Sequence, residues 1–192
     1  MTAESELTAT GAGLWRQWLD WAEGQGLSLP AAPGFEEARA RVWEASDFAA
    51  VTAARYPETL AGLLASGDLA CCYAPGDLER RLAADLADLA PGRADEGGLQ
   101  RRLRLFRRRE MLRIVWRDIS DAAPLDETLE DLSELADVCI RQALDRLRDW
   151  TRAELGTPRD ANGEEQPLLV IGMGKLGARE LNLSSDIDLI FA

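Results

Sequence analysis

The sequence predicts a mainly helical protein in which a long helical region precedes the start of an α/β unit. Apolar residues recur at helical spacing through most of residues 14–155. A loop-forming stretch, rich in glycine and polar residues, follows at residues 156–166. Residues 168–171 are then a short continuous apolar run, which is typical of a buried strand. We therefore place a domain boundary between a helical domain, residues 1–155, and an α/β segment, residues 156–192.

The first helices are predicted from apolar spacing and from breaker residues. Trp15, Trp18 and Trp21 recur at helical spacing, which favours packing against other helices over a role in base stacking. After a stretch with three glycines and two prolines, residues 24–34, residues 35–55 are expected to form a second helix. Pro57 suits the first position of a third helix, which is expected to reach about residue 65.

Three further helical stretches are expected in the rest of the helical domain. Leucines at 78, 82, 86 and 89 describe one buried stripe of a helix over residues 78–90. Residues 91–98 are expected to be a loop. Residues 99–119 and 125–155 are expected to be helices, separated by a break at residues 121–124.

Composition excludes several classes of function. The net charge of −12 and pI near 4.5 argue against a nucleic-acid-binding protein, which needs a basic surface. The sequence has no histidine, so no imidazole base or metal ligand is available from this chain. Because we find neither a signal peptide nor an apolar run near the ~20 residues that cross a bilayer, we expect a cytoplasmic protein without membrane contact.

The helix expected at residues 99–119 is unusually basic. Between Arg101 and Arg117 there are eight arginines and one glutamate. The run is expected to be a solvated face paired in part with acids elsewhere, with Glu110 as an internal partner. A basic wall near a phosphate site, or a docking surface for an acidic partner, is the functional alternative. The apolar positions of the same helix, expected to contact the core, are Met111, Leu112, Val115 and Trp116.

A glycine motif and an aspartate pair end the sequence. After the apolar run come Gly172-Met-Gly174-Lys-Leu-Gly177, then a polar connection, then Asp186-Ile-Asp188 and a second apolar run. One interpretation is a dinucleotide site, because the glycines satisfy G-x-G-x-x-G after a strand. The polar residues after Gly177 leave little room for the long helix that such a site needs, and the acids come too early for it.

The second interpretation is a metal-dependent phosphoryl site. Aspartates at positions i and i+2 of a strand point to the same face, and two converging carboxylates favour a cation such as Mg²⁺ between them. We expect Asp186 and Asp188 on the strand, with Ile187 and Leu189 turned into a core. An exposed acidic turn ahead of an ordinary strand is the alternative. The order of strand, glycine turn and Asp-x-Asp resembles nucleotidyltransferases of the DNA-polymerase-β type, which implies a polymerase-β-like α/β nucleotidyltransferase domain.

Side chains beside the aspartates are candidate phosphate ligands. Lys175 is the single lysine among the 22 lysines and arginines, and it lies inside the glycine turn, where its ammonium group can contact a phosphate oxygen. Chance placement on a surface turn is the alternative. Ser184 and Ser185 can cap the turn or bind phosphate. The candidate nucleotide- and phosphate-binding residues are Gly172, Gly174, Lys175, Gly177, Ser184 and Ser185, and the candidate catalytic and metal-binding residues are Asp186 and Asp188.

The run from Gly172 to Phe191 closely resembles the hallmark of bifunctional glutamine synthetase adenylyltransferase/adenylyl-removing enzymes. Segments at residues 106–118 and 127–137 also resemble that family. The family has two nucleotidyltransferase domains, and the position of the motif resembles the N-terminal copy. The resemblance implies Mg²⁺-dependent removal of AMP from a tyrosine of glutamine synthetase, with orthophosphate as acceptor and ADP as product. It also implies addition of AMP from ATP in the other copy, and a regulatory partner of the PII type.

The motif ends close to Ala192, before the third carboxylate that the superfamily usually places on a later strand. We therefore expect a truncated nucleotidyltransferase domain, an exposed apolar edge at residues 189–191, and little or no activity of this polypeptide alone. A non-catalytic helical interaction module with a vestigial α/β tail is the competing class of function.

Overall fold

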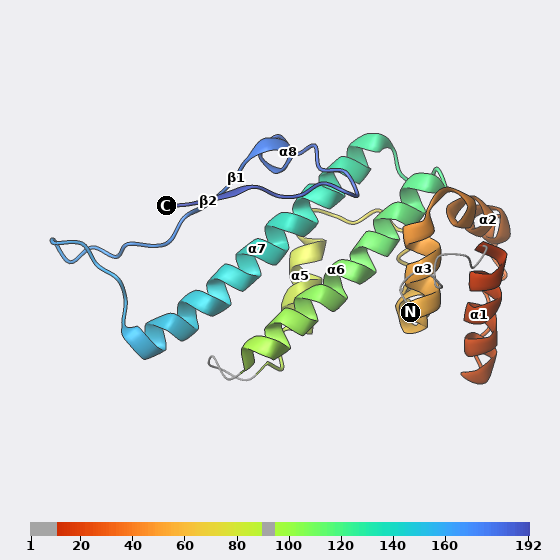
Figure 1. Ribbon diagram of the computed structural model, residues 1–192, viewed down its shortest axis with the longest axis horizontal. Coiled ribbons are helices and arrows are strands. Elements are labelled where there is room, and N and C mark those ends of the chain that lie inside the picture. The colour runs from red at the N-terminus through yellow and green to blue at the C-terminus, as the bar shows by residue number, and fades with distance from the viewer. Residues whose placement is uncertain (1–10, 90–94) are drawn as a thin grey trace, which may run out of the picture. The chain divides into compact units, whose positions relative to one another are not determined.

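The computed structural model describes residues 11–89 and 95–192. Most of these residues are helical, and Figure 1 shows the order of the elements along the chain. This confirms the mainly helical class, whereas the assignment of the last strands to a nucleotidyltransferase domain stays a prediction. The elements are α1 (Gly11–Gly24), α2 (Phe35–Ala45), α3 (Asp47–Arg55), α4 (Pro57–Ser66), α5 (Asp77–Asp85), α6 (Glu96–Ile119), α7 (Leu125–Leu155), β1 (Val170–Gly172), α8 (Gly174–Gly177) and β2 (Leu189–Phe191).

The chain packs as two compact units, and each long helix contributes to both of them. The first unit holds the described residues up to Cys72 together with Arg108–Thr128. The second holds Tyr73–Arg107 and Leu129–Ala192, as far as these are described. The boundary predicted after residue 155 falls inside the second unit, and as a boundary between domains it stays a prediction.

An aromatic cluster forms the core of the first unit. The rings of Trp15 and Trp18 stack with centroids 5.0 Å apart, and Trp43 meets Trp15 edge-on at 5.3 Å. Trp116 from α6 joins Trp43 at 6.0 Å. All four side chains are buried, so the prediction that Trp15 and Trp18 pack against other helices is confirmed. Trp21 is partly buried, with its ring centroid 6.2 Å from that of Trp18.

Ser46 divides the helix that was expected over residues 35–55. Its backbone is extended, with φ −140° and ψ 100°, so α2 ends before it. Its hydroxyl oxygen accepts a hydrogen bond from the amide of Ala49 at 3.2 Å, which caps the start of α3. The apolar pattern continues through both helices and therefore hid the break, because capping depends on one side chain rather than on periodicity.

Buried arginines in α6 correct part of the expectation of a solvated basic face, although Arg101, Arg104 and Arg107 are exposed as expected. Arg113 and Glu110 are both 0% exposed, and the Nε of Arg113 donates to Glu110 at 2.7 Å. Glu110 also pairs with Arg109, as expected for an internal partner. Arg117 is buried as well and binds Glu127 at 2.7 Å. The apolar contacts expected of this helix, Met111, Leu112, Val115 and Trp116, are all buried.

The second unit is built on the leucine stripe of α5 and on α7. Leu78, Leu82 and Leu86 are buried as predicted, whereas Leu89 is only partly buried. The helix α5 ends at Asp85, and Leu86 lies in the turn after it. The end expected for this helix at residue 90, and residues 91–94 of the expected loop, lie outside the described residues. The rest of the loop prediction is wrong for residues 96–98, because α6 begins at Glu96 rather than at residue 99. The bounds of α7 agree with the helix predicted over residues 125–155. Within the described ranges, no helix is both long and apolar enough to span a membrane.

Candidate functional site

The candidate site is built on a short antiparallel ladder of β1 and β2. Val170 pairs with Phe191, Ile171 with Ile190 and Gly172 with Leu189. Backbone bonds continue the ladder at both ends, and the amide of Met173 donates to the carbonyl of Asp188 at 2.9 Å. Asp188 therefore lies across from Met173, the second residue of the glycine turn.

The glycine turn is tight because backbone approaches backbone within it. A Cβ atom on Gly177 would lie 2.6 Å from the carbonyl oxygen of Gly172, a distance that no side chain tolerates. Gly174 has a φ of 54°, in the left-handed region that favours glycine. Leu176 is buried beneath the turn, where it anchors the four-residue helix α8. Glycine is therefore required by close backbone approach at position 177 and favoured by backbone conformation at position 174.

Asp188 lies beside the glycine turn. A Cβ built on Gly174 would be 3.9 Å from the carboxylate oxygen Oδ2 of Asp188. The carboxylate therefore occupies the space just outside the turn, and the same strand pairing that aligns the backbone places it there. This is the juxtaposition that a phosphate-and-metal site requires.

The register of β2 corrects part of the prediction for the aspartates. The strand begins at Leu189, so both Asp186 and Asp188 precede it rather than lying on it. Ile187, which was expected to turn into a core, is 42% exposed. Leu189 is partly buried, whereas Ile190 and Phe191 are exposed, as expected of most of the apolar edge.

Ser184 and Ser185 form a turn with Asn182 ahead of the aspartates. The hydroxyl of Ser185 donates to the Oδ1 of Asn182 at 2.8 Å and accepts from the Asn182 amide at 3.1 Å. The hydroxyl of Ser184 donates to the same Oδ1 at 3.4 Å. These bonds hold the chain in the conformation that leads into Asp186. Lys175 is exposed in the glycine turn, as both of its interpretations require.

Arg179 was not among the predicted residues, yet it fastens the glycine turn to α7. Its Nε and Nη2 atoms bind the two carboxylate oxygens of Glu130 at 2.7 and 2.5 Å. Its Nη1 binds Asp137 at 2.8 Å, and Nη2 lies 3.6 Å from Glu134. Hydrogen bonding to Glu130 raises the pKa of Arg179, and the guanidinium lowers the pKa of Glu130. The sequence shows that Glu130, Glu134 and Asp137 share one face of a helix, but it does not show that Arg179 is the residue they bind.

The two aspartates suit a magnesium ion by the chemistry of their donor atoms. Carboxylate oxygens are ligands that Mg²⁺ prefers, and it usually keeps further ligands from water and phosphate. In the part of the chain that the structure describes, no ion pair or hydrogen bond occupies either side chain, and no cluster of three or more acidic or cysteine ligands is present. The donor set therefore fits an ion held by two protein carboxylates and by a phosphate group.

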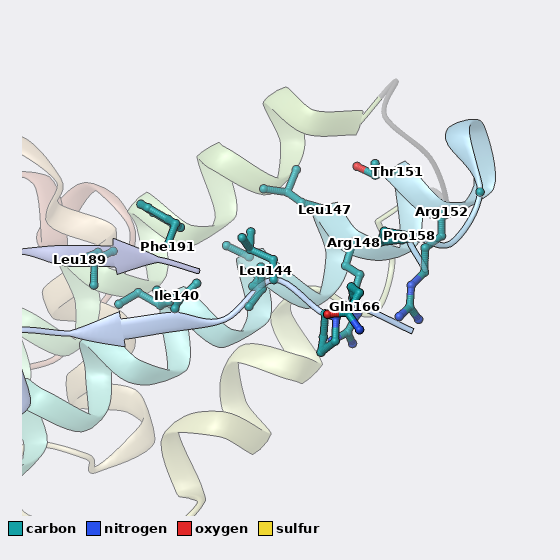
Figure 2. Close-up of a pocket in the computed structure, with 15 residues that line it drawn as sticks. Ile140, Leu144, Leu147, Arg148, Thr151, Arg152, Pro158, Gln166, Leu189 and Phe191 are labelled. Atoms are coloured by element: carbon teal, nitrogen blue, oxygen red, sulfur yellow. The ribbon is translucent and has the colours of Figure 1, made fainter. Parts of the chain in front are cut away.

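An apolar groove lies between the strands and α7 in the second unit. Figure 2 shows residues that line this groove, among them Leu189 and Phe191 of β2 and Ile140, Leu144 and Leu147 of α7. The groove has a volume of about 430 Å³ and its lining is mostly apolar. The two aspartates and the three glycines are not among its lining residues, so it is separate from the candidate site.

Comparison with known proteins identifies similar sequences. Residues 37–192 match the family described as glutamate-ammonia ligase adenylyltransferase. The chain is 50% identical over 170 residues, 86% of its length, to the bifunctional glutamine synthetase adenylyltransferase/adenylyl-removing enzyme of Thioalkalivibrio sulfidiphilus. It is 51% identical over 152 residues, 79% of its length, to the protein of the same description from Pseudomonas aeruginosa. The matches cover 16% and 15% of those relatives, so the chain spans about one sixth of their length.

Proposed function

Because the chain belongs to the glutamate-ammonia ligase adenylyltransferase family, we propose that it carries part of the adenylyl-removing site of an enzyme that regulates glutamine synthetase. The relatives are named for two activities, adenylyl transfer and adenylyl removal. We assign removal to this segment, since its motif resembles the copy that removes AMP. Transfer of AMP from ATP would then use a second motif elsewhere in the longer relatives.

The position of Asp188 beside Gly174 is the observation that carries this proposal. A carboxylate at 3.9 Å from the Cβ position of Gly174 can hold a cation next to a phosphate group in the turn. A dinucleotide site receives less support, because α8 has only four residues and a long helix normally begins after such a turn. We therefore propose Asp186 and Asp188 as the catalytic and metal-binding residues.

The other residues of the site orient phosphate oxygens. The amides of Met173 and Gly177 already donate to the carbonyls of Asp188 and Met173. The other backbone amides of the turn from Gly172 to Gly177 and the ammonium group of Lys175 would donate to phosphate oxygens. Ser184 and Ser185 complete the proposed set, and because their hydroxyls already bind Asn182, their main effect would be to shape the turn before Asp186. When bound, Mg²⁺ would supply positive charge at the reacting phosphoryl group, with Asp186 and Asp188 as its protein ligands.

The proposed reaction is phosphorolysis. An oxygen of orthophosphate forms a bond to the phosphorus of tyrosine-linked AMP, and the bond from that phosphorus to the tyrosine oxygen breaks. The released phenolate takes up the proton that orthophosphate loses, and the products are ADP and tyrosine. The sequence has no histidine, so this chain contributes through positioning and charge rather than an imidazole base. A PII-type regulator is proposed from the family resemblance alone, and the cytoplasmic location stays a prediction.

A chimera tests the proposal. This chain would replace the matching 170 residues of the Thioalkalivibrio sulfidiphilus relative, and ADP release from adenylylated glutamine synthetase would be followed with orthophosphate and Mg²⁺. Asp186→Asn and Asp188→Asn are each expected to lower the rate by about a hundredfold or more, because a carboxylate that holds the metal is lost. Asp149→Asn removes an exposed carboxylate of α7 and serves as the matched control.

Unchanged rates in both aspartate variants would refute the proposed site. A magnesium titration of the 192-residue chain by calorimetry provides a second measurement that needs no turnover. Weak binding of Mg²⁺ that both substitutions reduce supports the proposal, whereas equal binding by wild type and variants would favour a non-catalytic helical module.

A further inference from the structure

The backbone of Arg179 adopts a conformation that usually belongs to glycine. Its φ is 57°, in the left-handed region. The amide of Arg179 donates to the carbonyl of Leu176 at 3.1 Å, and the amide of Glu180 donates to the carbonyl of Lys175 at 2.8 Å. This pair of bonds is a Schellman motif that ends α8, and the left-handed position in that motif favours glycine. An arginine is therefore held where a residue without a side chain would be less strained.

The side chain of Arg179 supplies what a glycine could not. Its guanidinium makes a two-pronged contact with Glu130 and a further hydrogen bond to Asp137, and it lies near Glu134. These acids are spaced at i, i+4 and i+7, so α7 presents them on one face. A planar guanidinium suits this geometry, since its donors are fixed in a fork. The residue with the strained backbone is therefore also the residue that binds the three acids of α7. This combination indicates that Arg179 positions the turn that contains it.

Lys175 is the residue that this arrangement holds in place. Its carbonyl accepts the closing bond of the turn from Glu180, the neighbour of Arg179. Its own neighbour, Gly174, faces the carboxylate of Asp188. A shift of Arg179 would therefore move the backbone of Lys175 relative to Asp188.

We infer that Arg179 is a positioning residue that fastens the phosphate-binding turn to α7, through the acids Glu130, Glu134 and Asp137. This inference rests on the proposed function, because it assigns the turn to phosphate binding. Arg179 acts through Lys175 and the turn amides rather than by touching the reacting atoms. Loss of the ion pairs between Arg179 and α7 would weaken the binding of orthophosphate. The Michaelis constant for orthophosphate measures this effect.

Four variants in the chimera separate positioning from local backbone strain. Arg179→Gly relieves the left-handed strain and removes the guanidinium, and Arg179→Lys keeps the charge without the fork. Glu130→Gln combined with Asp137→Asn removes acceptors from α7 and leaves the turn sequence intact. Arg141→Ala, which removes an exposed arginine of α7 that pairs with Glu79, is the matched control.

The expected result is a higher KM for orthophosphate. Arg179→Gly and the double variant should raise it by about tenfold or more, because small displacements of a phosphate-holding group weaken binding. Arg179→Lys should fall between these and wild type, and Arg141→Ala should match wild type. In the 192-residue chain, the amides of Arg179 and Glu180 should exchange hydrogen faster in the double variant than in wild type.

The outcomes separate the inference from the proposed function. If Arg179→Gly and the double variant both have the wild-type KM for orthophosphate, the inference about Arg179 is wrong. The proposed function still stands in that case, provided that Asp188→Asn loses activity. A lower kcat with unchanged KM indicates a smaller folded fraction, and that result also overturns the inference. Full activity in Asp188→Asn removes the proposed function, and the inference with it.

Discussion

Gly177 lies so close to Gly172 that a Cβ atom on the former would be 2.6 Å from the carbonyl oxygen of the latter. The obstacle is backbone, which has no rotamer through which to move aside. The contact joins the end of α8 to the end of β1, so it fixes the turn to the ladder that carries Asp188.

Gly177→Ala should therefore destabilise the second unit. We expect a loss of about 1–3 kcal/mol in unfolding free energy, the usual cost of forcing an extra carbon into a packed site. Gly62→Ala is the matched control, because Gly62 lies within α4 with no atom within 4 Å of its Cβ position. The control should stabilise by about 0.5–1 kcal/mol. Denaturant unfolding of both variants checks the pair, and equal stability of Gly177→Ala and wild type would contradict the geometry.

The 192-residue polypeptide, assayed by itself, should show no measurable removal of AMP from glutamine synthetase. Its described residues contain two strands and two candidate metal ligands at the site, without a third acid beside them. A cation held by so few protein ligands would be weakly bound. The assay is ADP release at saturating orthophosphate, compared with the chimera. Turnover comparable to the chimera would show that the two aspartates suffice.

Removing Glu110 should destabilise the first unit more than removing any exposed charge of α6. The carboxylate is fully buried and pairs with both Arg109 and Arg113, so Glu110→Ala removes an anion that faces the buried guanidinium of Arg113. We expect a loss of about 3–5 kcal/mol. Arg104→Ala changes an exposed arginine on the same helix and should stay within about 0.5 kcal/mol of wild type. Thermal unfolding measures both, and a small loss at Glu110 would mean that the pair is dispensable.

The pairing of Glu130 with Arg179 should make part of the stability depend on acid. The guanidinium lowers the pKa of Glu130, so the folded state binds its proton less readily than the unfolded chain does. The stabilisation is therefore present at neutral pH and is lost as the pH falls through the acidic range below about pH 5. Unfolding of wild type and Glu130→Gln should differ at about pH 7 and converge at about pH 3. If the unfolding free energies of wild type and Glu130→Gln still differ at low pH, the stabilisation comes from side-chain packing rather than from the ion pair.

Local patterns account for the parts of the fold that the sequence predicted well. The bounds of α7 follow from a long apolar stripe, and Pro57 marks the start of α4. The break at Ser46 escaped prediction because a capping side chain left the apolar period intact. The start of β2 was misplaced for a related reason: Ile187 is apolar, yet nothing in the described residues covers it enough to bury it.

The burial of Arg113 shows a second limit of sequence patterns. Charge alone predicted a solvated face for α6, because arginines are mostly exposed. Glu110, three residues earlier on the same helix, satisfies part of the guanidinium, and the core of the first unit closes over both. A hydropathy scale scores each residue separately as buried or exposed. It therefore misses a charged residue that is buried because it is paired with an opposite charge.

The amino-acid sequence by itself determined the helical class, the three glycines of the turn and the order of the Asp-x-Asp pair, because each of these depends on residues close together in the chain. Tertiary structure alone decided that Asp188 lies beside Gly174 and that Arg179 binds Glu130, which is 49 residues away. The physical reason is that an ion pair across such a separation forms only after helix packing and strand pairing have fixed both backbones. Until helix packing and strand pairing have formed, Glu130, Glu134 and Asp137 could pair with any arginine or lysine of the chain.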